Sequence, residues 1–127
     1  MNSLEVGKEV FSLLSNDSRL TALVGNKIYP VIVEKETTFP FIVYKRSNVI
    51  PDYIKDLHLK DEVIIDIICV SNDYAEGIEI AGIVRDILED NRIQPKGIQS
   101  IKLESATEDY TDDAYVQTLG FNLTITK

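Results

Sequence analysis

Residues 62–89 determine the fold predicted for this chain: EVIIDIICV (62–70) continues through SNDYAE (71–76) into an amphipathic stretch that ends near residue 89. The first part is apolar and rich in β-branched residues, which is typical of a buried strand. In the connection, Asp73 is followed three residues later by Glu76, the spacing of a helix capping box with Asp in place of Ser or Thr. The pattern predicts one strand that leads directly into one long helix.

Segments on either side of this unit follow the same two periodicities. The predicted segments are helices at 4–14 and 19–24 and strands at 28–33, 39–46, 98–105 and 114–126. The last strand has the clearest alternation of apolar and polar residues, as expected for a half-buried antiparallel strand. We therefore expect a single α+β domain over residues 1–127, in which a mainly antiparallel sheet is packed by an N-terminal helix and one long central helix.

Composition limits the classes of protein that fit. With 127 residues, of which 44% are hydrophobic and 27% charged, the chain is large enough to form a core without disulfides or metals. The net charge of −8 argues against a nucleic-acid binder, which needs clustered Lys and Arg. The single cysteine fits a reducing cytoplasm, and neither a secretion signal nor a membrane-spanning run is evident. We expect a soluble protein made in the cytoplasm, with no specific nucleic-acid partner and no membrane partner.

The sequence carries no catalytic or metal-binding signature, so we expect neither an enzyme nor a cofactor. His58 is the only histidine, and no motif supplies it with catalytic partners. Cys69 falls on the apolar face of a predicted strand, where a buried structural thiol is expected. The acidic stretch 108–113 lacks the alternating ligands and central Gly of a calcium loop, which favours a solvated hairpin turn over a cation site.

Two features exceed what a small monomer needs. The predicted helix carries a second apolar stripe, and the segment 47–59 is too apolar for a linker yet has no clear period. Either the chain covers these residues itself, or they form subunit contacts, because soluble monomers rarely expose contiguous apolar patches. In the second case the segment is an arm or extended hairpin that reaches a neighbour. The candidate subunit-contact residues are Ile50, Tyr53, Ile54, Ile80, Ile83 and Ile87.

Several short motifs occur in an order that resembles a known family. LVGNKIYP (23–30), FPFIVY (39–44), the strand at 63–70 and SNDYAE (71–76) follow one another as in the tail-completion proteins of long-tailed bacteriophages, which include tail-terminator, or tail-to-head joining, proteins. The resemblance extends over residues 4–125. The matching positions are core and turn residues, namely Ile28, Tyr29, Pro30, Pro40, Phe41, Asp73, Tyr74 and Ala75.

The resemblance implies a structural virion protein, synthesised in the bacterial cytoplasm and located in the tail or neck, with no catalytic residue. Proteins of this kind form a six-membered ring on the head-proximal end of a non-contractile tail tube, where they stop tube polymerisation and present a surface to the head. The implied partners are therefore the chain itself in a ring, a tail-tube protein and a head–tail connector protein. An acidic ring is compatible with passage of DNA, because like charge discourages adhesion.

Two other interpretations stay open at this point. A different neck protein or minor tail component would carry the same sequence features. A bacterial protein- or ligand-binding module with a similar small α+β fold is the second, because a fold does not determine a function.

Overall fold

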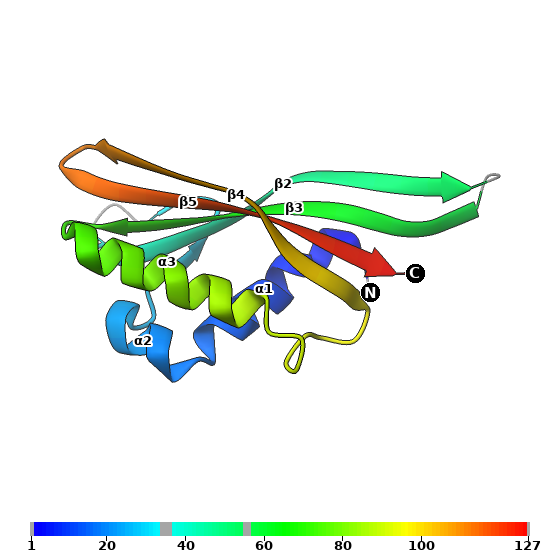
Figure 1. Ribbon diagram of the computed structural model, residues 1–127, viewed down its shortest axis with the longest axis horizontal. Helices are drawn as coiled ribbons and strands as arrows, with labels where there is room; N and C mark the ends of the chain where they lie inside the picture. Colours follow the sequence, from blue (N-terminus) through cyan, green and yellow to red (C-terminus); the bar gives the residue numbers. More distant parts are fainter. Residues whose placement is uncertain (1, 34–36, 55–56, 127) are drawn as a thin grey trace.

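The computed structural model describes residues 2–33, 37–54 and 57–126 and confirms the α+β fold. The elements in chain order are η1 (Ser3–Glu5), α1 (Val6–Ser15), α2 (Ser18–Val24), β1 (Ile28–Pro30), β2 (Phe41–Ile54), β3 (Leu57–Ser71), α3 (Tyr74–Leu88), β4 (Ile98–Thr111) and β5 (Ala114–Thr126). The helices lie together on one face of the sheet (Figure 1). The structure therefore has two layers, one of helices and one of strands.

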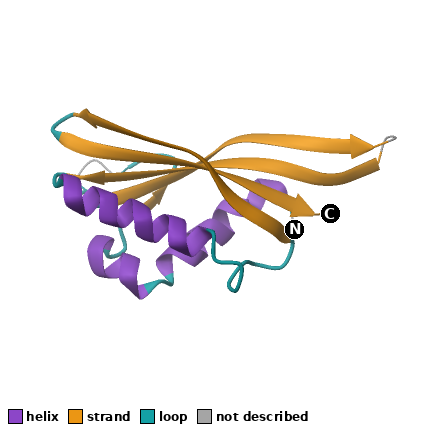
Figure 2. Ribbon diagram, viewed as in Figure 1, coloured by secondary structure: helices purple, strands orange, loops and turns teal. Residues whose placement is uncertain are grey.

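The sheet has five strands in the order β1-β2-β3-β5-β4. β1 pairs in parallel with β2, and the pairings β2–β3, β3–β5 and β4–β5 are antiparallel, so the sheet is mixed but mainly antiparallel, as predicted. The β2–β3 hairpin extends beyond the helices on one side, and the β4–β5 hairpin turns at the opposite side (Figure 2). The helices thus cover the middle of the sheet and leave the β2–β3 end uncovered.

The core lies between the helices and one face of the sheet. On β3 the alternate residues Val63, Ile65, Ile67 and Cys69 are each at most 1% exposed, which confirms the alternation predicted from the sequence. They pack against buried residues of α1, α3 and β5. The intervening residues of β3 point to the helix-free face, where they are half-buried. One face of β3 is thus buried and the other is half-buried, which explains why the strand is apolar on both faces.

The corner between β3 and α3 is built as the capping pattern indicates, with one additional residue. Asp73 is the N-cap and accepts a hydrogen bond of 3.0 Å from the Ala75 backbone N–H. Glu76 does not reach the Asp73 backbone directly. Instead the Ser71 hydroxyl accepts from the Asp73 N–H at 3.0 Å and donates to Glu76 Oε1 at 2.8 Å. Because Ser71 is fully buried, this relay fixes the direction in which the helix leaves the strand.

The second apolar stripe of α3 belongs to the core of the chain. Ile80 and Ile87 are 0% and 1% exposed, and Ile83 is half-buried against the same core. The physical reason is that α3 contacts α1 and α2 as well as the sheet, so it needs two apolar stripes. Ile80 and Ile87 are therefore core residues of the chain, whereas a subunit contact at the half-buried Ile83 stays a prediction.

Within the segment 47–59, residues 47–54 belong to β2 and residues 57–59 to β3, so both strands are longer than the sequence predicted. Residues 55–56 lie outside the described residues. The register shifts between Arg46 and Asn48 and again between Asp52 and Tyr53. Each shift moves the following side chains to the opposite face, which removes the period of two that identifies a strand in sequence. β4 likewise extends to Thr111, past the predicted end at residue 105, with a register shift between Leu103 and Ser105.

Candidate interaction surfaces

The residues that the sequence analysis weighed for catalysis or metal binding are placed as follows. Among the residues that the structure describes, no group of three or more His, Cys, Asp or Glu side chains is placed to hold a metal ion. Cys69 is buried, and this burial raises the pKa of its thiol to about 12, so it is protonated and unreactive at neutral pH. The side chain of His58 lies outside the described residues. None of the described helices combines the length and apolar character needed to span a bilayer.

The β2–β3 hairpin presents apolar side chains to solvent. Ile50 is 50% exposed and Tyr53 is 61% exposed, and Leu59 on the opposite strand is also exposed. The end of the hairpin extends beyond the helix layer (Figure 1). Ile54 belongs to β2, but its side chain lies outside the described residues. Of the six candidate subunit-contact residues, Ile50 and Tyr53 are the two that the structure places on an open surface.

The opposite end of the sheet carries a tyrosine cluster. The ring centroids of Tyr74 and Tyr115 are 5.4 Å apart, and those of Tyr110 and Tyr115 are 4.9 Å apart. Glu108 accepts hydrogen bonds from Gln117 Nε2 at 3.1 Å and from the Tyr74 hydroxyl at 2.9 Å. These two bonds lower the pKa of Glu108, and the bond to Glu108 raises the pKa of Tyr74. A charged carboxylate is therefore held beside three aromatic rings.

The turn that joins β4 to β5 is the hairpin turn predicted from the acidic stretch. Asp112 and Asp113 have φ angles of 52° and 62°, the left-handed pair that two-residue hairpin turns require. All residues from 104 to 113 are exposed. Residues 108–113 contain four carboxylates and no basic residue, so this end of the hairpin carries a charge of about −4 at neutral pH. We refer to residues 108–115 as the hairpin end.

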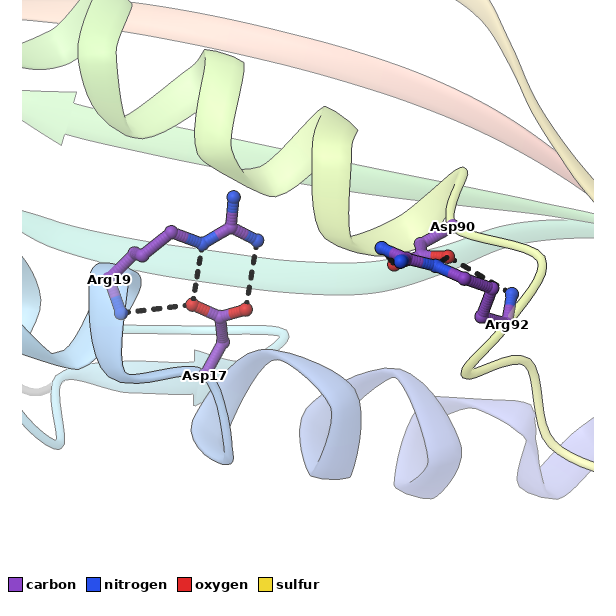
Figure 3. A network of polar contacts seen from close by, with 4 residues as sticks. All are labelled: Asp17, Arg19, Asp90 and Arg92. Atoms are coloured by element: carbon purple, nitrogen blue, oxygen red, sulfur yellow. Dashed lines mark hydrogen bonds and ion pairs between the residues drawn. The ribbon is translucent and has the colours of Figure 1, made fainter.

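Two Asp–Arg pairs lie in the helix layer, where α2 begins and where α3 ends (Figure 3). Asp17 accepts from the backbone N–H of Arg19 at 2.9 Å and from its guanidinium at 3.2 and 3.0 Å. Asp90 binds Arg92 in the same way, at 3.0, 3.0 and 2.9 Å. The arginine hydrogen bonds lower the pKa of both carboxyl groups. In each pair the carboxylate is hydrogen-bonded to the arginine of the same segment. We therefore interpret both pairs as structural contacts that stabilise helix ends.

The sequence did not single out the tyrosine cluster. Tyr110 and Tyr115 pair directly across the hairpin. Tyr110 lies two residues before Asp112, and Tyr115 lies two residues after Asp113. Once the turn was assigned to these two aspartates, this spacing would have predicted that the two tyrosines pair. Tyr74 is far away in the sequence and joins the cluster only because α3 begins beside the hairpin, so no local pattern contains it.

Comparisons with known proteins identify the family. The sequence matches the family described as "Tail completion protein gp17" over residues 8–126. Curated protein sequences give no match. A similar solved chain is described as "Virion of native gene transfer agent (GTA) particle"; it has a TM-score of 0.75 and 19% sequence identity, over 93% of this chain and 92% of that chain. At this identity the likeness concerns the fold. Because the family match extends over nearly the whole chain, this protein belongs to the tail completion protein gp17 family and is a structural tail-completion protein.

Proposed function

We propose that this protein forms a ring, with six copies, on the head-proximal end of a tail tube. The ring stops polymerisation of the tube protein and presents the surface to which the head–tail connector binds. The family match over residues 8–126 is the observation that carries the proposal. The similar fold of a chain from a gene transfer agent virion supports it, because such a particle is phage-like.

The exposed side chains support a role that depends on protein–protein contacts. Large apolar or aromatic residues are exposed on the β2–β3 hairpin, such as Ile50 and Tyr53, and on the hairpin end, such as Tyr110. The two surfaces differ from each other and lie at opposite ends of the sheet (Figure 2). Contacts between unlike surfaces of identical copies are heterologous, and they close into a ring when the rotation permits. The proposed role requires no catalytic group, so we propose that the protein is not an enzyme.

Deletion of the gene from its phage or prophage tests this function. We expect tail tubes of uncontrolled length without heads, together with heads that lack tails. Restoring the wild-type gene in trans should restore complete particles, which controls for effects on neighbouring genes. Loss of a different neck component would leave headless tubes of normal length, and unchanged particles would contradict a role in tail completion. The bacterial binding module considered above is not retained, since the family match excludes it.

A further inference from the structure

A groove with a volume of about 460 Å³ opens beside β1, where the N-terminal helical segment begins. Leu4, Val31 and Tyr44 supply its apolar surface, and the first two are 62% and 65% exposed. Arg46 Nη1 donates a hydrogen bond of 2.8 Å to the Leu4 carbonyl, which ties the η1 turn to β2 beside the groove. The groove is therefore a preformed apolar surface that the described part of the chain leaves in contact with solvent.

The border of the groove is basic. Lys8, Lys45 and Arg46 line it, with Glu5 as the single acidic residue. Three positive charges and one negative charge give a charge of about +2 at neutral pH, in a chain whose net charge is −8. The Lys8–Glu5 ion pair is exposed and 3.5 Å long, so it holds Lys8 only weakly. We call this site the basic groove.

Val31 is held in an unfavourable backbone conformation at this site. Its φ angle is 67°, in the left-handed region that β-branched residues rarely adopt. The Val31 N–H donates to the Tyr44 carbonyl at 2.9 Å, which fixes this conformation. Glycine or asparagine would relieve the strain, yet the chain places an exposed valine here and follows it with the exposed Ile32. Strained residues with solvent-exposed apolar side chains are expected where a partner binds.

The hairpin end has the complementary character and lies at the other edge of the sheet. β1 is one edge strand and β4 is the other. The hairpin end combines the 57% exposed Tyr110 with four carboxylates, whereas the basic groove combines apolar side chains with three basic residues. Complementary charge favours this pairing and disfavours contact between two hairpin ends or two grooves.

We propose that the hairpin end of one copy docks in the basic groove of a second copy, with Tyr110 against Val31 and the Asp112 and Asp113 carboxylates beside the basic border. The occupant is a second copy of this chain because the two complementary surfaces lie at opposite edges of one sheet. Repetition of this contact is head-to-tail, and once the ring closes every hairpin end and every basic groove is occupied. The inference rests on the proposed ring and names the contact that builds it.

Disulfide crosslinking of a variant with Tyr110→Cys and Val31→Cys tests the contact, with Tyr110→Cys and Leu4→Cys as a second pair. Because Cys69 is buried, the introduced thiols are the reactive ones. Oxidation should give a reducible ladder that ends at the ring. A mixture of the two single-cysteine variants should stop at the dimer, since each chain then has one reactive surface. A control variant with Tyr110→Cys and Ala22→Cys, exposed on α2, should give no ladder.

The crosslinking is carried out on the purified chain and on particles assembled in cells from the gene at its own locus, so that assembly on the tube is included. Absence of the ladder from both, or a ladder equal to that of the control variant, overturns the proposed contact. Dimers from Tyr110→Cys alone also overturn it, because they indicate a symmetric contact between hairpin ends. If the wild-type chain still forms rings in those cases, the proposed function stands. If wild-type rings are absent from both solution and particles, the proposed function fails as well.

Discussion

The carboxylate of Glu89, which follows α3, accepts a hydrogen bond of 3.1 Å from the backbone N–H of Leu103 in β4. The other oxygen of Glu89 accepts from Arg85 Nε at 2.7 Å. One side chain therefore joins the end of α3 to the edge strand whose far end carries the tyrosine cluster. It also satisfies a backbone donor at the register shift between Leu103 and Ser105, where the ladder with β5 is interrupted.

We expect Glu89→Gln to lower the free energy of unfolding by about 1 kcal/mol, because the hydrogen bonds to Leu103 and Arg85 lose the charged acceptor. Urea denaturation followed by circular dichroism measures the change. Glu79→Gln, at an exposed position of the same helix, is the matched control and should have little effect. Equal stability of the two variants would show that the bond to β4 contributes nothing.

Stability should fall in acid, in part through Asp17. Hydrogen bonds from the Arg19 side chain lower the pKa of Asp17 below its ordinary value of 3.8. A carboxyl group whose pKa is lower in the folded state stabilises it above the unfolded pKa, and this contribution is lost as the pH falls through the folded pKa. We expect Asp17→Asn to be less stable than wild type at pH 6, and the difference to shrink as the pH falls below 3.8 and through the lowered folded-state pKa of Asp17. A difference that is independent of pH would contradict this account.

Ile87→Ala should lower the free energy of unfolding by about 2–5 kcal/mol, because Ile87 is 1% exposed in the core. Ile50→Ala is the matched control on the β2–β3 hairpin and should change stability by less than about 0.5 kcal/mol. Chemical denaturation of the two variants gives both values. If the Ile87 variant instead kept its stability, α3 would not pack as described.

Ile50→Ser and Tyr53→Ser, made together, should weaken assembly while leaving the folded chain intact. Both side chains are exposed on the β2–β3 hairpin, whose end extends past the helices, so their proposed contacts are with other subunits. Native mass spectrometry over a concentration series measures ring formation, and electron microscopy of complemented particles measures tail completion. Ile93→Ser, at another exposed apolar position, is the control. Normal rings and normal particles from the double variant would show that these two side chains of the β2–β3 hairpin are needed neither for ring formation nor for tail completion.

The sequence predicted the elements that bury one face against the core. The alternation of β3 and β5, the Asp73 cap and the buried Cys69 were all predicted because burial of one face leaves a period in the sequence. The length of the β2–β3 hairpin was underestimated because it extends beyond the helices (Figure 1), and the end of β4 was missed because residues 104–111 are all exposed. Strands without a buried face need no period of two. In β2, the register shift between Arg46 and Asn48 also interrupts the alternation of apolar and polar residues.

The candidate interaction surfaces were predicted less well, for a different reason. Ile80 and Ile87 exceeded what packing on one sheet face requires, and the sequence left open whether the chain or a second subunit covers them. In the structure α1 and α2 bury this second stripe. The basic groove brings together Leu4, Val31 and Tyr44 from three separate segments. Only the arrangement of β1 beside β2, with the N-terminal turn tied to Arg46, places these residues in one surface.

A cryo-electron microscopy reconstruction of the head–tail junction, in particles that contain this chain, tests the central claim most directly. We predict a ring of six copies between the last tube ring and the head connector, with the hairpin end of each copy in the basic groove of the next. A junction without this chain, or with a single copy or an open arrangement in place of a ring, would contradict the proposed function.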